Sequence, residues 1–426
     1  MSWSGPARTR GTAMTGARAR RVLTATALVL GLAAACSGPG ADGRGGERDY
    51  RFWDPYTQFG DDSEWAALVA DCGRRAGVSL HRTGYDGSDL TTRAILAGQQ
   101  GSSPDVLVLD NPVVTTLAEG ELLLPVDELP VDLGDFEENL LESGELDGTR
   151  YGVPIGANTL ALYYNADVLA DAEVDPAAIH DWADLSAALT EISAKGHRGI
   201  TFAAIGNEEG TYQFLPWFWG SGADLEELDS PAAVAALRLW KGWLDADLAP
   251  NSVINNNQTT SWQEFETGTY GFALNGTWQL ANARASGIDF GVIPIPSRHG
   301  GPAPGAAGGE MVTVPVQEDP RRYERSRAIV ECLVSDDNLL TTDTVLSYVA
   351  PVEALTARQR AEDPELSPWI SAVREARGRT ANDLGTRYPL ISENLWTAVG
   401  NALSGAETPQ DALAFAQEAV TSDFGR

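Results

Sequence analysis

The stretch Asp105-Val106-Leu107-Val108-Leu109-Asp110-Asn111-Pro112 decides the class of fold. Its short, β-branched apolar run predicts a buried strand, and the polar residues and proline that follow end it. Working outward, the pattern predicts strands at 50–53 and 78–80 and helices at 64–76, 90–97 and 113–118. Strands and helices therefore alternate, which predicts an α/β fold built on a largely parallel sheet.

The same alternation continues through the rest of the chain. We expect strands at 159–164, 199–203, 270–274, 290–295 and 311–316, and helices at 182–195, 231–244, 320–333 and 409–420. Four tryptophans, Trp65, Trp182, Trp240 and Trp243, lie at helical spacing and are expected to pack in the core. Residues 297–309 are so rich in glycine and proline that they predict a loop.

The N-terminus has the layout of an export signal. Five arginines and no acidic residue precede an apolar run from Val22 to Ala35, and this run is too short to span a membrane. Its end, Leu32-Ala33-Ala34-Ala35-Cys36, resembles the bacterial lipobox, although Ala33 stands where that motif prefers leucine. We therefore expect a lipoprotein signal peptide over 1–35, a lipid on Cys36 and a flexible tether over 36–48. A cleaved signal without a lipid and a twin-arginine route both stay open.

Composition narrows the partners. The chain has 60 acidic and 30 basic residues, a formal net charge of −30, and the acidic residues are spread thinly. Nucleic-acid binding draws on clustered lysine and arginine, so this partner class is excluded. No later apolar run approaches the length that crosses a membrane, so the lipid would be the chain's only membrane contact.

Two cysteines remain if Cys36 carries a lipid. Cys72 and Cys332 each lie on the apolar stripe of a predicted helix, so each sulfur should face a core. Export to an oxidising compartment favours a disulfide between them. Two unrelated buried thiols are the alternative that spacing alone leaves open.

Three groups of motifs stand in a distinctive order. The first runs Ala97-Gly98, Ser103-Pro104-Asp105-Val106 and Leu117-Ala118-Glu119-Gly120. The second runs Gly148-Thr149-Arg150-Tyr151-Gly152-Val153-Pro154, Leu160-Ala161-Leu162-Tyr163-Tyr164-Asn165 and His180-Asp181-Trp182-Ala183-Asp184-Leu185. The third runs Gly276-Thr277-Trp278, Gly291-Val292-Ile293-Pro294-Ile295-Pro296 and Gly308-Gly309. In this order they resemble the sugar-binding family of extracellular solute-binding proteins of ABC importers. The stretch 265–274 departs from the family in register.

The resemblance implies two α/β lobes joined by a hinge, with a ligand in the cleft between them. We expect the first lobe to comprise 49–158 and 309–350, and the second 159–308 and 351–426. The resemblance further implies a monomer on the extracellular face of the membrane that passes a sugar to permease subunits. It implies neither a cofactor nor catalysis.

Candidate ligand residues combine aromatic plates with polar groups, because sugars offer apolar ring faces and hydroxyls. They are Trp53, Tyr56, Gln58, Asp110, Asn111, Tyr163, Trp217, Trp219, Trp278, Gly309, Glu310 and Arg387. Trp217 and Trp219 are expected on an extended stretch, where i and i+2 side chains point the same way. A helix cap is the alternative for Asp110, and a structural ion pair is the alternative for Arg387.

A secreted glycoside hydrolase is the rival class of protein. Such an enzyme would need two facing carboxylates. A chain with 60 acidic residues contains many possible pairs, so the presence of acidic residues does not favour this class. The sequence has no Gly-x-Ser-x-Gly motif, and its four histidines lack the spacing of a zinc helix. We therefore predict a binding protein without a metal or a catalytic residue.

Overall fold

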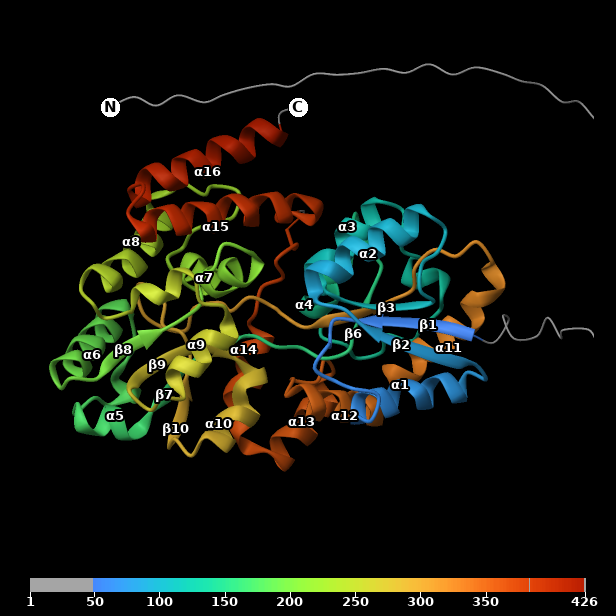
Figure 1. Cartoon of the computed structure of the whole chain (residues 1–426), viewed down its shortest axis with the longest axis horizontal. Helices are drawn as coiled ribbons and strands as arrows, with labels where there is room; N and C mark the ends of the chain where they lie inside the picture. The colour runs from blue at the N-terminus through green and yellow to red at the C-terminus, as the bar shows by residue number, and fades with distance from the viewer. Residues whose placement is uncertain (1–48, 383, 425–426) are drawn as a thin grey trace, which may run out of the picture. The chain divides into compact units, whose positions relative to one another are not determined.

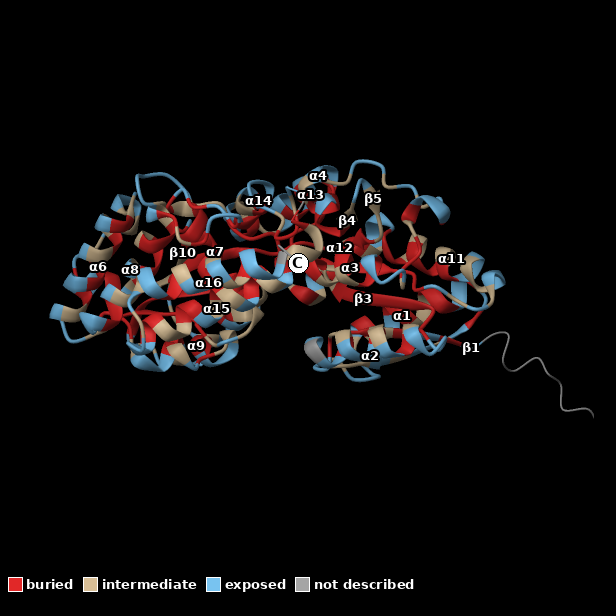
Figure 2. Ribbon diagram, turned by 90° about the horizontal axis from the view of Figure 1, so that it is seen from above, coloured by how far each residue is buried: buried red, intermediate tan, exposed pale blue. Residues whose placement is uncertain are grey.

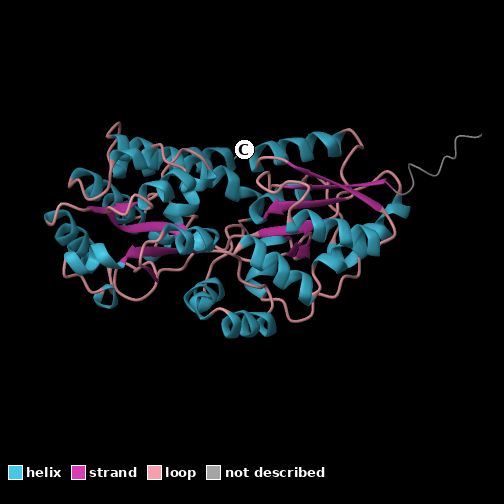
Figure 3. Cartoon of the chain, turned by 60° about the horizontal axis from the view of Figure 1, so that its bottom comes forward, coloured by secondary structure: helices cyan, strands magenta, loops and turns pink. Residues whose placement is uncertain are grey.

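Two larger β-sheets, each covered by helices, organise the described part of the chain, and a two-stranded ladder at residues 145–150 accompanies them (Figures 1 and 3). The structure is a computed structural model that describes residues 49–382 and 384–424. Cys36, the export signal and the tether lie outside the described residues. The described residues form one compact unit. The predicted α/β class is confirmed.

The strands follow one another as β1 Asp49–Asp54, β2 Ser79–Gly84, β3 Val106–Asp110, β4 Glu145–Leu146, β5 Thr149–Arg150, β6 Val153–Pro154, β7 Leu160–Asn165, β8 Arg198–Thr201, β9 Tyr270–Gly276, β10 Phe290–Ile293 and β11 Glu310–Thr313. The α-helices are α1 Glu64–Arg75, α2 Gly87–Gln99, α3 Asn111–Glu119, α4 Glu138–Leu141, α5 Ala166–Asp171, α6 Trp182–Ala194, α7 Glu208–Gly220, α8 Pro231–Asp245, α9 Gln258–Phe265, α10 Leu280–Ser286, α11 Tyr323–Leu333, α12 Asp336–Leu346, α13 Glu353–Glu362, α14 Ser367–Arg374, α15 Tyr388–Ser404 and α16 Pro409–Phe424. Two 3₁₀ turns matter below, η5 Thr277–Gln279 and η8 Gly385–Arg387.

The prediction of a largely parallel sheet holds for β1, β2 and β3 but not for most of the later strands. In the first sheet, ordered β2-β1-β3-β11-β6, β1 is parallel to β2 and β3, but β11 is antiparallel to β3 and β6. In the second sheet, ordered β10-β7-β9-β8, β7 is antiparallel to both neighbours and only β8 and β9 are parallel. The chain leaves the first sheet after β6 and returns to it with β11. β11 therefore pairs in antiparallel orientation with β3 and β6, which lie far from it in sequence. We call each sheet with its helices a lobe. The exact lobe boundaries stay a prediction.

Local sequence signals explain where many helices begin and end. Ser63 caps α1 by accepting a hydrogen bond from the Ala66 N–H, and the left-handed Gly77 follows the helix (φ 75°). Asp181 caps α6 in the same way. The predicted helix at 320–333 begins later, because residues 320–322 form a 3₁₀ turn before α11.

The second lobe corrects the prediction for the Trp217–Trp219 stretch. These residues lie in α7, not in an extended segment, because Phe214, Trp217 and Phe218 follow helical spacing and are buried together. Residues two apart on a helix point in different directions, so Trp217 and Trp219 do not share a face. The four tryptophans expected in the core are all buried. Figure 2 shows that buried residues line the inner faces of the helices and the strands.

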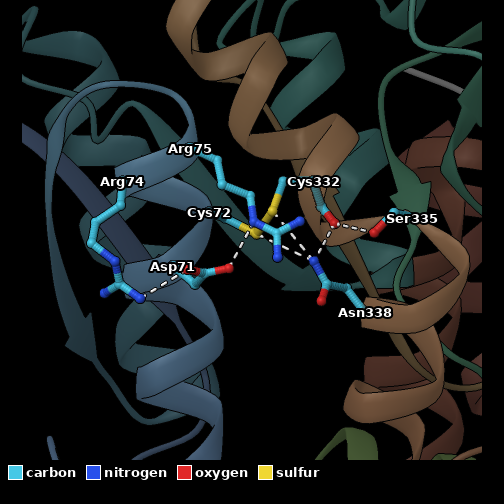
Figure 4. Close-up of a disulfide and its surroundings, with 7 residues drawn as sticks. All are labelled: Asp71, Cys72, Arg74, Arg75, Cys332, Ser335 and Asn338. Atoms are coloured by element: carbon cyan, nitrogen blue, oxygen red, sulfur yellow. Dashed lines mark hydrogen bonds and ion pairs between the residues drawn. A yellow bond between two sulfur atoms is a disulfide. The ribbon is translucent and has the colours of Figure 1, made fainter.

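The predicted disulfide is confirmed and joins two helices of the first lobe. Cys72 of α1 and Cys332 of α11 have their sulfurs 2.04 Å apart (Figure 4). The Asn338 amide donates to the Cys332 carbonyl at 2.7 Å beside the bond. The bond closes a loop across 260 residues of sequence. It therefore ties the N-terminal part of the lobe to the part that returns after the second sheet.

The lobes are linked by backbone that crosses at close quarters. Asn158 and Gly308 exchange two backbone hydrogen bonds, of 3.0 and 2.9 Å. Gly309 has φ 116°, and a Cβ there would lie 2.5 Å from the Gly156 carbonyl oxygen. Only glycine fits such a position without moving the neighbouring strand.

Candidate functional site

The end of β3 and the start of β11 place two carboxylates side by side where the first lobe meets the second. Asp110 and Glu310 are cross-strand partners in the antiparallel β3–β11 pair. Their side chains are therefore neighbours across the ladder. Asn111 follows Asp110 directly, is buried, and donates to the Ala307 carbonyl at 3.1 Å.

Arg379 joins this edge to the second lobe. Its guanidinium forms a bidentate pair with Asp110 (2.6 and 3.2 Å) and also donates to Glu208 of α7 at 2.7 Å. A fourth bond reaches the Asn111 side-chain oxygen at 2.9 Å. The Arg379 side chain is only 3% exposed, so the guanidinium makes these charge-assisted bonds from a buried position, while its carboxylate partners stay partly exposed. One arginine thus bridges acidic groups of both lobes.

Aromatic rings lie beside this arginine. The Arg379 guanidinium sits 4.9 Å above the Tyr212 ring, and the Tyr212 hydroxyl hydrogen-bonds Asn158 at 3.0 Å. The partly exposed Trp278 of η5 lies 6.3 Å from Tyr212 between ring centroids. We call Asp110, Asn111, Glu208, Tyr212, Glu310 and Arg379 the interlobe cluster. Three carboxylates, one guanidinium, an amide and aromatic faces can bind hydroxyls and apolar ring surfaces together.

Glu310 is held in an unusual environment. It accepts hydrogen bonds from the hydroxyls of Tyr56 (2.8 Å) and Tyr348 (2.9 Å). Burial, reinforced by the nearby charge of Asp110, raises its pKa from 4.5 to about 7, although the two tyrosine hydrogen bonds act the other way. The cluster therefore gains negative charge as the pH rises through neutrality.

This pKa gives a testable pH dependence. Folded Glu310 holds its proton to a higher pH than unfolded Glu310, so its contribution to stability is complete below about pH 4.5 and is lost as the pH rises through about 7. Urea unfolding at pH 5 and pH 8 should show a smaller loss of stability on raising the pH in Glu310→Gln than in the native chain. The exposed Glu318→Gln is the control and should match the native chain. An unchanged pH dependence in Glu310→Gln would contradict the assignment.

The loop after β1 is held mainly by contacts with residues of its own lobe. Asp54 is fully buried, pairs with Arg82 and accepts from the Trp65 indole at 2.9 Å. Tyr56 is buried and reaches the cluster through Glu310, whereas Gln58 is exposed and contacts no cluster residue in the described hydrogen bonds. Trp53 is partly exposed and packs edge-on against Tyr85 at 5.2 Å.

Some of the other predicted ligand residues lie next to the interlobe cluster, and others lie away from it. Gly309 lies next to the cluster and accepts from the Asn111 N–H at 3.3 Å. Tyr163 and Trp217 are fully buried in the core of the second lobe and present no surface to a ligand. Arg387 lies in η8 and pairs with Glu226 at 3.3 Å, the structural alternative considered for it. Asp110 does occupy the N-cap position of α3, as the cap alternative expects, but its side chain bonds Arg379 and no α3 backbone N–H.

Trp219 lines a small separate pocket of about 100 Å³. Its lining also includes Asp224, Glu226, Arg377 and Asn382, and the Arg377 guanidinium lies 5.8 Å from the Trp219 ring centre. The pocket is within the second lobe, on the helix that also carries Glu208 and Tyr212. The pocket is therefore near the C-terminal end of α7, whereas the interlobe cluster is near its N-terminal end.

Three cluster residues escaped sequence analysis, namely Glu208, Tyr212 and Arg379. The i, i+4 spacing of Glu208 and Tyr212 on one helix face was the only available signal. Among the described residues, no group of three histidine, cysteine or acidic side chains could hold a metal ion. Within the same ranges, no helix is long and apolar enough to cross a membrane.

The geometry defines a two-lobed α/β binding protein. Residues 67–368 match the family described as bacterial extracellular solute-binding protein, which is most of the chain, so the chain belongs to this family. The family and its relatives are binding proteins and not catalysts, so the glycoside hydrolase alternative is not retained.

Relatives with assigned names are distant. The maltodextrin-binding protein MdxE of Bacillus subtilis is 26% identical over 334 residues, which cover 74% of this chain and 76% of that protein. A binding protein of Brucella abortus is 27% identical over 252 residues, 56% of this chain. That match spans only 60% of the Brucella protein's length.

Solved structures share the fold. The cyclic α-maltosyl-1,6-maltose binding protein of Arthrobacter globiformis aligns with a TM-score of 0.73 at 23% identity, covering 88% of this chain and 98% of that one. UgpB of Mycobacterium tuberculosis, solved with glycerophosphocholine, aligns with a TM-score of 0.76 at 20% identity, covering 89% and 98%. The expected two-lobed solute-binding fold is confirmed.

Proposed function

We propose that this chain is a lipid-anchored extracellular receptor that binds a sugar or oligosaccharide at the interlobe cluster and delivers it to the permease of an ABC importer. The observation that carries the proposal is the bridge from Asp110 through Arg379 to Glu208, beside the rings of Tyr212 and Trp278. Fixed carboxylates and a guanidinium suit hydroxyls, and the rings suit sugar faces. Two relatives from Bacillus subtilis, a maltodextrin-binding protein and a galactooligosaccharide-binding protein, agree with this solute class.

The position of the cluster suggests how binding would become a signal. Groups from both lobes would contact one solute, so the solute would favour the arrangement in which the lobes lie closest together. A permease that recognises this arrangement would distinguish loaded from empty receptor. The chain's own part in delivery is therefore to bind and to change the distance between its lobes.

A panel of solutes tests the proposal directly. Thermal unfolding would be followed with equal concentrations of monosaccharides, maltooligosaccharides and galactooligosaccharides, with glycerophosphocholine as a non-sugar. A rise in the melting temperature with a sugar supports the proposal. A rise only with the non-sugar, or with none of the solutes, would contradict the sugar assignment.

The lipid anchor has its own test. The disulfide supports export to an oxidising compartment, and the lipobox-like end of the signal names Cys36 as the acylated residue. Expressed in a bacterium that processes lipoproteins, the native chain should remain with the membrane fraction, whereas Cys36→Ser should be released or should keep its signal. The mass of the mature N-terminus checks this. Equal membrane retention of both chains would contradict lipidation at Cys36.

A further inference from the structure

A second pocket is lined in part by residues of α10, α12 and α13 and touches the interlobe cluster through Tyr348, whose hydroxyl donates to Glu310 at 2.9 Å. Figure 1 shows where these three helices lie. The volume of the pocket is about 250 Å³. It is lined by Leu280, Arg284, Asp343, Thr344, Ser347, Tyr348, Gln359, Glu362, Asp363 and Leu366. Its walls therefore come from both lobes and are mainly polar.

Asp343 is the exceptional group in this lining. The residue is 1% exposed, and neither carboxylate oxygen has a hydrogen-bond partner among the described residues. The carboxylate lies against the crossing backbone, since a Cβ on Gly156 would be 2.5 Å from its Oδ1. A buried carboxylate without a partner is costly, so a fold that keeps one in a pocket wall suggests a ligand that supplies the partner.

The neighbouring groups are already paired with one another. Arg284 binds Asp363 at 2.6 Å and Glu365 at 2.8 Å. The Gln359 side chain accepts from the Ala350 N–H and donates to the Tyr348 carbonyl, at 2.8 and 2.9 Å. These donors are therefore occupied, as are the hydroxyls of Thr344 and Tyr348, whereas neither carboxylate oxygen of Asp343 has a partner among the described residues. A ligand must bring donors of its own.

The charged residues of the pocket lining favour a positively charged ligand. Three acidic residues, Asp343, Glu362 and Asp363, line the pocket against the single basic residue Arg284. Leu280 and Leu366 add an apolar wall that suits a short carbon chain. A metal ion does not fit, because no group of three suitable ligands occurs among the described residues. A protonated amine offers a positive charge with up to three N–H donors.

We propose that this pocket binds a small protonated amine with Asp343 as its counter-ion. The inference goes beyond the proposed sugar site and does not depend on it. Because the pocket has walls from both lobes, an amine there would also favour one arrangement of the lobes over another.

The protonation of Asp343 gives an independent readout. Burial raises the pKa of Asp343 well above its usual value, so the empty pocket favours the protonated acid. An ammonium ion would favour the carboxylate, and its binding should release a proton. The other charged or titratable groups that line the pocket are Arg284, Tyr348, Glu362 and Asp363. Of these, Arg284 and Asp363 pair with each other, and Tyr348 donates to Glu310. Calorimetry in two buffers of different ionisation enthalpy measures that proton.

The probe is ethanolammonium chloride at pH 7.5, against sodium chloride at equal ionic strength. Calorimetry should detect binding to the native chain with proton release, and at least tenfold weaker binding to Asp343→Asn. The matched control is Asp337→Asn, on the same helix with its side chain 93% exposed, which should bind as the native chain does. Thr344→Phe, which narrows the pocket from an exposed position on its rim, should also lose binding even if Asp343→Asn does not fold. No binding to the native chain, or equal binding by the native chain and Thr344→Phe, would overturn the proposal.

Discussion

Replacing Arg379 with leucine is expected to lower the free energy of unfolding by about 2–4 kcal/mol. The substitution leaves Asp110, Glu208 and the Asn111 oxygen without their shared donor. Removing one partner of a buried ion pair is costly because the remaining charge is still desolvated. The expected loss is below the full cost of a buried charge, because the Asp110 and Glu208 side chains stay 41% and 34% exposed.

The control is an arginine in an exposed pair. Arg358 lies 4.0 Å from Asp337 with its side chain 50% exposed, so Arg358→Leu should cost less than about 1 kcal/mol. Urea unfolding of the two variants and the native chain makes the comparison. Similar small losses in both variants would mean that Arg379 does not hold the lobes together as described.

Removing the disulfide is expected to have the largest effect on stability. The double variant Cys72→Ser/Cys332→Ser should lose about 3–5 kcal/mol, because the bond restricts a very long loop in the unfolded chain. The loss should appear in urea unfolding under non-reducing conditions. Native protein unfolded with a reductant should lose a similar amount.

A second variant separates the cross-link from its surroundings. Asn338→Ala removes the hydrogen bond to the Cys332 carbonyl and the contacts to the sulfurs but keeps the bond (Figure 4). It should cost about 1 kcal/mol. If Asn338→Ala were as damaging as the double variant, local packing and not the cross-link would account for the effect.

Most helices and strands could be predicted from sequence signals that act over a few residues. The Ser63 cap, the buried run of β3 and the glycine after α1 each act within a few residues, so the sequence predicts these elements near their observed positions. The pairing of β3 with β11 depends on contacts some 200 residues apart, as the register of Leu107 with Thr313 shows. Alternation of strands and helices carries no information about such pairs, which is why the prediction of parallel pairing holds for β1, β2 and β3 but not for β11.

The candidate site was predictable only in part, for the same reason. Asp110, Asn111 and Glu310 lie at strand ends, where a sheet edge meets a ligand, so position along the chain marks them. Arg379 lies in an irregular segment, and its role exists only through contact with Asp110, 269 residues earlier. Trp217 was predicted to face a ligand together with Trp219 because the stretch was expected to be extended, whereas in α7 the rings of Trp182 and Trp243 pack against Trp217.

The most direct test of the central claim is calorimetric titration of the sugar selected by the panel, with analysis of the sugar recovered afterwards. Asp110→Asn keeps the shape of the side chain but removes the charge that faces Arg379, and Glu318→Gln is the exposed control. We predict saturable binding of an unchanged sugar, at least tenfold weaker in Asp110→Asn and unaltered in the control. Cleaved sugar recovered from the calorimeter would contradict a receptor that binds its solute unchanged. Equal affinity of Asp110→Asn and the native chain for the sugar would contradict binding at the interlobe cluster.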